Sequence, residues 1–195
     1  TEYSQISRLM NTSALMMPHF DYKFATKQLI TKQPKQATKQ LLVLLIDYSG
    51  SMCESEKIRW VNAIVYNRLS AVMNNKAELF IGFFVRSLDM DRLFHIKDKK
   101  SAYKFGENFR FSPDGGGTNI QYAIEQTCDG IDKGKLGKHI ITGANPQIVV
   151  MNDGQDMIDP SFKPKYMTNA FILGQDNEQL KKVVQSTDGH YERFL

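Results

Sequence analysis

The chain has 195 residues, of which 42% are hydrophobic and 11% aromatic, and this composition predicts one folded domain rather than a disordered protein. No run approaches the roughly 18 consecutive apolar residues that a membrane-spanning helix requires, so no membrane segment is expected. The net charge of +4 comes from residues 1–40, which carry six basic and two acidic groups. Residues 41–195 carry 19 of each, so the domain lacks the basic surface typical of nucleic-acid binding.

The chain begins with a basic segment of weak periodicity. We expect residues 1–39 to form an N-terminal extension that packs on, or leads into, a domain over residues 40–195. Within this extension, residues 6–10 have the apolar spacing of a short amphipathic helix. Residues 22–30 alternate loosely enough for an edge strand.

The regular pattern starts with an unbroken apolar run over residues 41–46, which ends at Asp47. Such a run is typical of a strand that is buried on both faces of a parallel sheet. A helix is expected over about residues 54–74, where apolar residues recur at intervals of three and four. Residues 77–85 predict a second core strand. Residues 92–96 predict an antiparallel neighbour, because the turn between the two is too short for a parallel crossover.

The second half of the chain alternates helices and strands. We expect helices over residues 101–109, 119–133 and 177–185, strands over residues 147–151, 166–173 and 191–195, and a glycine- and lysine-rich connection over residues 134–146. This order favours an α/β fold with a mostly parallel six-stranded sheet, one antiparallel edge strand and helices on both faces.

The strongest functional signal follows the first strand, in the sequence Asp47-Tyr48-Ser49-Gly50-Ser51. It places a carboxylate and two hydroxyls at the carboxyl end of a core strand, where open α/β sheets bind ligands. All three side chains offer oxygen, the atom that hard cations such as Mg²⁺ and Ca²⁺ prefer. A purely structural role is the alternative, since Asp and Ser also favour turns and helix N-caps.

Two further oxygen donors occupy equivalent places. Thr118 lies at the tip of a glycine-rich loop just before a helix, and Asp153 follows a buried strand. Loops at the carboxyl ends of parallel strands emerge on one rim, so these side chains can converge with those of the first motif. Glycines 115–117 are expected to let the backbone approach a bound ion. The candidate site has five members: Asp47, Ser49, Ser51, Thr118 and Asp153.

In these residues the chain resembles the von Willebrand factor type A (vWA) domain and its metal-ion-dependent adhesion site. The D-x-S-x-S motif of that family appears at residues 47–51 and its G-G-T-N loop at residues 116–119. Its T-D-G step appears at residues 152–154, with Asn in place of the usual hydroxyl residue. The resemblance covers about residues 40–195 and implies a three-layer Rossmann-like fold. Residue 195 comes where the family usually has a closing helix, so that helix is expected to be missing, and the helix shift of some members is left open.

The resemblance also implies roles for the five residues. Ser49 and Ser51 would bind the metal directly, Thr118 directly or through water, and Asp47 and Asp153 mainly through water. Neutral hydroxyl ligands leave most of the charge of the cation uncancelled, so the ion keeps a position for a Glu or Asp carboxylate of a partner protein. Mg²⁺ is the expected ion because it holds octahedral geometry with several waters, and Mn²⁺ or Ca²⁺ are alternatives.

Enzyme classes receive little support from the sequence. The chain has no Walker loop and no G-x-S-x-G elbow, and its four histidines are scattered among polar neighbours. Asp47 has the place of the phosphoryl acceptor of some phosphatases, but Ser49 stands where those enzymes need a second acid.

We therefore expect a metal-dependent protein-interaction module that is not an enzyme. Its two cysteines are far apart in the sequence and make no disulfide framework, which favours a cytoplasmic protein. A scaffold protein or the partner of an AAA+ ATPase fits that setting. An extracellular adhesion domain is the alternative, and a Mg²⁺-dependent hydrolase or phosphotransferase is the third candidate.

Overall fold

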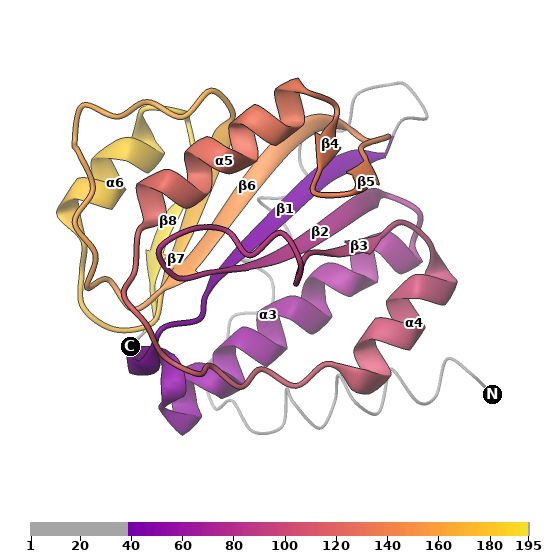
Figure 1. Ribbon diagram of the computed structural model, residues 1–195, viewed down its shortest axis with the longest axis horizontal. Coiled ribbons are helices and arrows are strands. Elements are labelled where there is room, and N and C mark those ends of the chain that lie inside the picture. The colour runs from indigo at the N-terminus through magenta and orange to yellow at the C-terminus, as the bar shows by residue number, and fades with distance from the viewer. Residues whose placement is uncertain (1–38, 195) are drawn as a thin grey trace. The chain divides into compact units, whose positions relative to one another are not determined.

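Six strands form the central sheet of the computed structural model, which describes residues 39–194 (Figure 1). The helix expected over residues 6–10 and the edge strand expected over residues 22–30 lie outside the described residues. The strands are β1 (Gln40–Asp47), β2 (Ala77–Phe84), β3 (Phe94–Ile96), β6 (Ala144–Asn152), β7 (Met167–Ile172) and β8 (Tyr191–Arg193). Their order is β3-β2-β1-β6-β7-β8, and only β3 runs antiparallel to its neighbour. The predicted fold class is confirmed.

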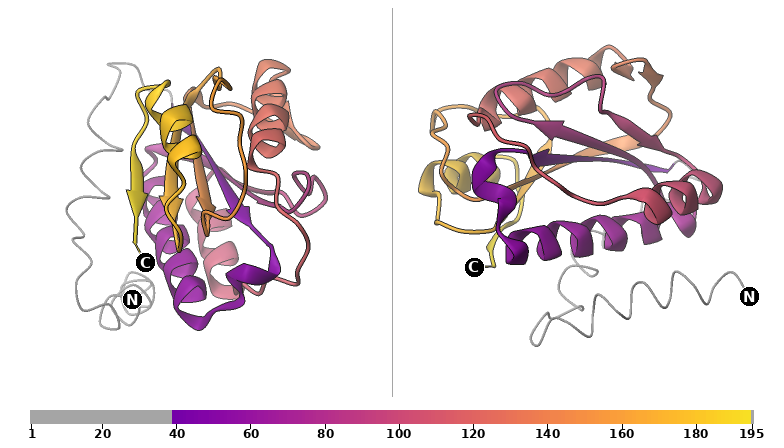
Figure 2. Two further views of the ribbon diagram at one scale, coloured as in Figure 1. Left: turned by 90° about the vertical axis from the view of Figure 1, so that its left-hand side faces the viewer. Right: turned by 60° about the horizontal axis from the view of Figure 1, so that its bottom comes forward.

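Helices cover both faces of this sheet (Figure 2). The helices are α3 (Ser55–Met73), α4 (Lys99–Asn108), α5 (Ile120–Asp132) and α6 (Glu178–Gln185), with a short 3₁₀ helix, η1 (Gly50–Cys53), after β1. Buried residues of α3 and α4 share one hydrophobic cluster, and those of α5 and α6 share the other. No helix within residues 39–194 combines the length and the apolar character that crossing a bilayer requires.

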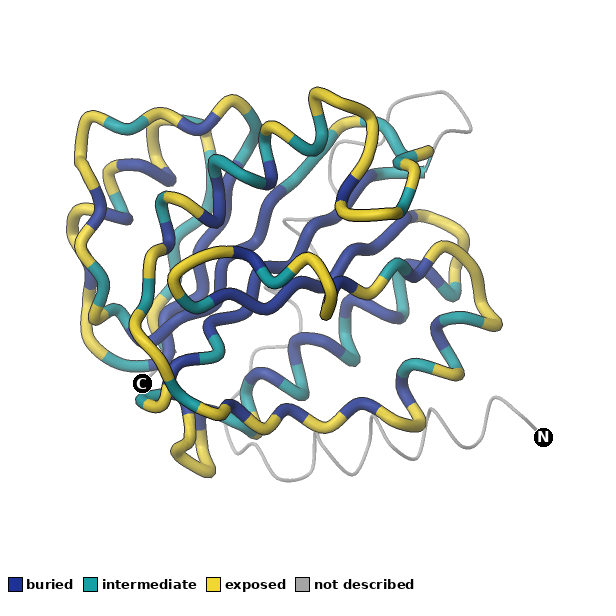
Figure 3. Tube along the Cα trace, in the orientation of Figure 1, coloured by how far each residue is buried: buried dark blue, intermediate teal, exposed yellow. Residues whose placement is uncertain are grey.

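The unbroken apolar run of β1 is explained by its central place in the sheet. Successive side chains of a strand point to opposite faces, and here both faces are covered. Leu42, Leu44 and Ile46 pack on the side of α3, and Leu41, Val43 and Leu45 pack on the side of α5. Figure 3 shows the result as a continuous band of buried residues along the central strands.

Two local features differ from the sequence-based expectation. Helix α4 begins at Lys99, two residues earlier than expected, because Asp98 and Ser101 cap it reciprocally. The Asp98 carboxylate accepts a hydrogen bond from Ser101 N at 2.7 Å, and the Ser101 hydroxyl accepts one from Asp98 N at 3.1 Å. Such a capping box satisfies two backbone donors that the first turn would leave unpaired.

The connection expected over residues 134–146 contains a small hairpin. Strands β4 (Lys135–Leu136) and β5 (His139–Ile140) pair antiparallel, and the connection also supplies the first residues of β6. Leu136 is fully buried, packing against Gly130 of α5. One buried residue anchors the hairpin, and two-residue strands are too short to show alternation in the sequence.

Candidate metal centre

The last residue of β1 begins the candidate site. Asp47 is fully buried, and its Oδ1 accepts a hydrogen bond from Ser49 N at 2.8 Å. This bond turns the chain sharply after the strand and leads into η1, where fully buried Met52 fixes the turn in the core. The turn thereby holds the hydroxyl of Ser49 beside that of Ser51, with 3.0 Å between the two Oγ atoms.

The separation of these two hydroxyl oxygens matches a small octahedral cation. Ligands at right angles around Mg²⁺, each about 2.1 Å from the ion, lie about 3.0 Å apart. Ligands in the same arrangement around Ca²⁺, at about 2.4 Å, would be about 3.4 Å apart. The Ser49 and Ser51 hydroxyls are hydrogen-bonded to each other at 3.0 Å, and this separation is also compatible with two neighbouring positions on Mg²⁺ once that hydrogen bond is given up.

The loop before α5 brings Thr118 to the same place. Its Oγ1 donates a long hydrogen bond of 3.4 Å to Asp47 Oδ2. Asn119 N donates to Val85 O at 2.8 Å, which fastens the end of the loop to the residue after β2. Asp156 Oδ2 accepts from Ile120 N at 2.6 Å and so ties the start of α5 to the loop after β6.

At one position of this loop, packing within the protein explains the glycine. Gly116 has a φ of +120°, and a Cβ there would lie 2.3 Å from Val85 Cγ1. Gly117 is different, since its added Cβ would have no atom closer than Arg86 Nε, at 3.8 Å. Gly116 is therefore explained by its contact with Val85. For the other two glycines, close approach of the backbone to an ion stays a prediction.

Asp153 contributes a buried oxygen with no hydrogen-bond partner. It follows β6 directly and is 2% exposed. Its Oδ1 accepts from Gln155 N at 3.2 Å, but its Oδ2 has no hydrogen bond within the described part of the chain. A buried carboxylate oxygen without a donor is costly and points to a missing cation or water.

Comparisons with known proteins bear on this arrangement. No protein-family model matches the sequence, and no curated protein sequence matches it. Among solved structures, the chain is similar to the ArnB paralog VWA2 from Sulfolobus acidocaldarius, with 18% identity and a TM-score of 0.57 over 80% of this chain and 41% of that one. It is also similar to a von Willebrand factor type A protein from Catenulispora acidiphila, with 14% identity and a TM-score of 0.54 over 81% of this chain and 39% of that one. The SpRpn10 VWA domain matches with 9% identity and a TM-score of 0.52, over 80% of this chain and 88% of that one.

The chain has the vWA fold. The six-stranded, mostly parallel sheet with helices described above agrees with this likeness, which extends over about four fifths of the chain. The chain spans about two fifths of the length of the first two structures, and at these identities the likeness establishes the fold alone.

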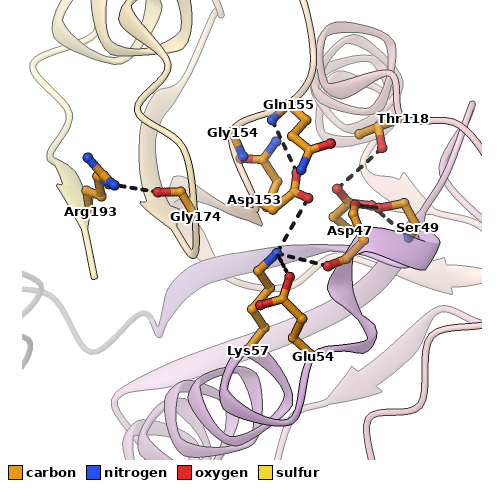
Figure 4. A network of polar contacts seen from close by, with 12 residues as sticks. Asp47, Ser49, Glu54, Lys57, Thr118, Asp153, Gly154, Gln155, Gly174 and Arg193 are labelled. Atoms are coloured by element: carbon orange, nitrogen blue, oxygen red, sulfur yellow. Dashed lines mark hydrogen bonds and ion pairs between the residues drawn. The ribbon is translucent and has the colours of Figure 1, made fainter. Parts of the chain in front are cut away.

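A lysine that sequence analysis missed also enters the candidate site of this vWA fold. Lys57, in the first turn of α3, is buried, and its Nζ donates to Ser51 O at 2.9 Å and to Glu54 Oε1 at 3.0 Å. The same nitrogen forms a long ion pair of 3.8 Å with Asp153 Oδ2, the oxygen that has no hydrogen bond (Figure 4). Its position four residues before the buried Val61 is the signal that could have revealed it, because residues four apart share a helix face.

The electrostatics of the site favour an added cation. Burial raises the pKa of Asp47 to about 6, the nearby charge of Asp153 adds to the rise, and hydrogen bonds from Ser49 and Thr118 oppose it. Burial also raises the pKa of Asp156. Asp47, Asp153 and Asp156 thus lie near one another, with the ammonium of Lys57 beside Asp153. Their negative charge exceeds the positive charge of this lysine.

The five predicted residues come together as one rim site in the vWA fold. Asp47, Ser49, Ser51 and Thr118 are linked by direct hydrogen bonds, and Asp153 faces them from the end of β6 (Figure 4). Within residues 39–194 no three His, Cys, Asp or Glu side chains are grouped to hold a metal. Any metal here would therefore depend on hydroxyl oxygens as well as the two carboxylates, and the donor set fits a small, hard cation.

Proposed function

We propose that this chain is a divalent-metal-dependent protein-interaction module that binds a Glu or Asp carboxylate of a partner protein. The observation that carries the proposal is the gathering on one rim of two hydroxyls 3.0 Å apart and the buried Asp153 carboxylate, whose Oδ2 has no hydrogen bond and only the Lys57 ammonium at 3.8 Å as a charged partner. This arrangement suits Mg²⁺ by its spacing, with Mn²⁺ as the closest substitute. The likeness to vWA structures supports an interaction role over a catalytic one.

The residues divide into two groups by charge. The hydroxyls of Ser49, Ser51 and Thr118 would hold the ion, and the carboxylates of Asp47 and Asp153 would orient its waters. A bound cation supplies an electropositive point to which an incoming carboxylate can attach. Because the hydroxyl donors are neutral, they leave that charge available to the partner.

We place this module in the cytoplasm, as a scaffold or the partner of an AAA+ ATPase. Both Cys53 and Cys128 are free thiols, and Cys53 is exposed one turn from the candidate metal centre. An exposed free thiol suits a reducing compartment better than an oxidising one. An adhesion role outside the cell is the second candidate, since the same metal chemistry would serve there.

Calorimetry and peptide selection together test this proposal. Titration of the full chain with Mg²⁺ should show one site, and a random linear peptide library panned in Mg²⁺ should yield binders rich in Asp and Glu. Asp47→Ala and Thr118→Ala should bind these peptides at least tenfold more weakly while keeping the helical circular dichroism of the wild type. Equal binding in excess EDTA, or by both variants, would overturn the metal-dependent function.

A further inference from the structure

A cavity of about 780 Å³ lies between β3, α4 and the loop that leads to Thr118. It begins at Tyr48, the residue between the candidate metal-centre residues Asp47 and Ser49. It continues past Ser112 and Asp114, which belong to the loop that carries Thr118. The lining of the cavity therefore includes residues from two of the three segments that build the metal centre.

Five Phe and Tyr rings form most of the apolar part of its wall. The centroids of Tyr48 and Phe83 are 5.0 Å apart, and Phe83 lies 6.1 Å from Phe94. Phe105 lies 5.0 Å from Phe94 and 4.9 Å from Phe109. Phe83 and Phe109 are buried at the inner part of this wall, whereas Phe94 is 40% exposed, so part of the apolar lining is open to solvent. Apolar cavities with a few polar groups are where proteins take apolar ligand groups.

The rim of the cavity is positively charged. Arg92, Lys104 and Arg110 line it, against the single carboxylate of Asp114. Arg92 lies 3.6 Å from Asp114 and 3.6 Å from Asp89, which is outside the lining, and has its guanidinium 5.5 Å from the centre of the Tyr48 ring. Lys104 is exposed, and within the described residues it forms no ion pair. The rim therefore keeps an excess of positive charge beside an aromatic wall.

We propose that this cavity receives an aromatic or large aliphatic side chain from an acidic peptide segment of the partner protein. The same segment presents the carboxylate that meets the metal, so the inference rests on the proposed function. An acidic segment complements the rim of three basic residues. Residues 1–38 of this chain are unsuitable occupants by charge, since they carry five basic and two acidic groups. Large aromatic side chains that fill such pockets are among the residues that contribute most to binding at protein interfaces.

The selected peptides of the metal-centre experiment provide the test. Peptides that bind the full chain in Mg²⁺ should combine Asp or Glu with Phe, Trp, Tyr or Leu a few residues away. Replacing that apolar residue by Ala in a synthetic binder should weaken binding at least tenfold. Phe94→Ala and Lys104→Glu should each weaken it by a similar factor, while Lys163→Glu, an exposed lysine in the loop before β7, should not.

The outcomes separate this inference from the proposed function. Peptides enriched in acids alone, or unchanged binding by both Phe94→Ala and Lys104→Glu, would overturn the cavity assignment and leave the metal function standing. Binding that needs the apolar residue but ignores EDTA and Asp47→Ala would overturn the metal function instead. Failure to select any peptide would count against both.

Displacement of a selected peptide by a synthetic peptide of residues 1–38 would assign the cavity to the chain itself. Phe94→Ala must keep the calorimetric Mg²⁺ signal, which shows that the variant is folded.

Discussion

Asp47 carries an electrostatic cost in the metal-free protein. Its carboxylate is fully buried, and its pKa is raised to about 6 from 3.8. Between these two values the folded state binds more protons than the unfolded state. The stabilising effect of the protonated form is fully present below about pH 4 and is lost as the pH rises through 6. At neutral pH, burial of this charge therefore lowers the free energy of unfolding.

Asp47→Asn should remove this pH dependence. In EDTA, the unfolding free energy of the wild type relative to the Asn variant should fall by up to about 3 kcal/mol between pH 4 and pH 7. Urea denaturation of both proteins at half-unit pH intervals measures the difference. The difference includes the coupling between Asp47 and Asp153, and the other titrating groups are common to the two proteins. Parallel pH profiles would show that Asp47 ionises as freely when folded as when unfolded.

Lys57 is expected to act as an internal competitor of the metal. Its ammonium lies 3.8 Å from Asp153 Oδ2 and is buried, so it offsets part of the negative charge that would attract a cation. Lys57→Met should lower the metal-free unfolding free energy by about 1–3 kcal/mol, because Asp153 loses its counter-ion. The same change should strengthen Mg²⁺ binding about tenfold, because the buried ammonium that repels the ion is removed.

Arg59→Met is the matched control for that prediction. Arg59 lies on the same helix and the variant loses the same charge, but Arg59 is exposed. Calorimetric titration and urea denaturation should give wild-type values for this variant. Weaker Mg²⁺ binding in Lys57→Met would instead make Lys57 a support of the site.

The sequence identified the members of the candidate site but not its internal charge balance. Asp47, Thr118 and Asp153 were predictable because each stands at the end of a strand or the start of a helix, where topology fixes the rim. Lys57 was not, since a lysine within an amphipathic helix is usually on its solvent face. Asp156 was missed for a related reason: its bond to Ile120 N joins residues 36 apart, a pairing that no local pattern encodes.

At the scale of elements, the loop after β6 is held by contact between two backbones. Gly154 has a φ of +85°, and a Cβ there would lie 1.7 Å from Gln175 O in the loop after β7. Gln175 N donates to Asp153 O at 2.8 Å, so the two loops are joined directly beside the candidate metal centre. Any side chain at residue 154 must separate them.

Gly154→Ala should therefore damage the fold and the site together. We expect an unfolding free energy lower by about 2 kcal/mol or more and weaker Mg²⁺ binding, because Asp153 moves with the loop. Gly117→Ala is the control: its φ is not positive, and the nearest atom to the added Cβ is 3.8 Å away. Thermal denaturation of both variants compares their stability, and calorimetric titration compares their affinity for Mg²⁺. Equal tolerance of the two substitutions would show that the loops after β6 and β7 can separate freely.

Helices and strands with many buried apolar residues were easier to predict from the sequence than those with few. The strands β1, β2, β6 and β7 carry apolar runs because their residues pack on both faces, and their positions were anticipated within three residues. The β4–β5 hairpin escaped prediction because it buries only Leu136. The start of α4 depended on a reciprocal cap rather than on apolar spacing.

At the scale of the whole molecule, the core of the described residues consists of two hydrophobic clusters, one on either side of the sheet. The carboxylates and hydroxyls of the candidate site gather on one rim, contributed by β1, by the loop before α5 and by β6. These segments come from opposite halves of the sequence, with 105 residues between Asp47 and Asp153. A cation bound by all of them would join distant parts of the chain and would prefer the folded state over the unfolded one.

Mg²⁺ should consequently stabilise the full chain against heat and urea. Binding that is confined to the folded state contributes about 2.7 kcal/mol when the free ion is at 100 times its dissociation constant. For a chain of this size, such a contribution raises the melting temperature by roughly 5–10 °C. Scanning calorimetry in Mg²⁺ and in EDTA, at ionic strength matched with NaCl, measures the shift.

Asp47→Ala should show almost no increase in melting temperature, because the ion loses the buried carboxylate that faces Thr118 and anchors the turn at Ser49. Ca²⁺ should stabilise the wild type less than Mg²⁺, since the two serine oxygens lie closer together than a larger ion prefers. A shift of equal size in wild type and Asp47→Ala would mean that Mg²⁺ acts on the surface at large and not at this rim.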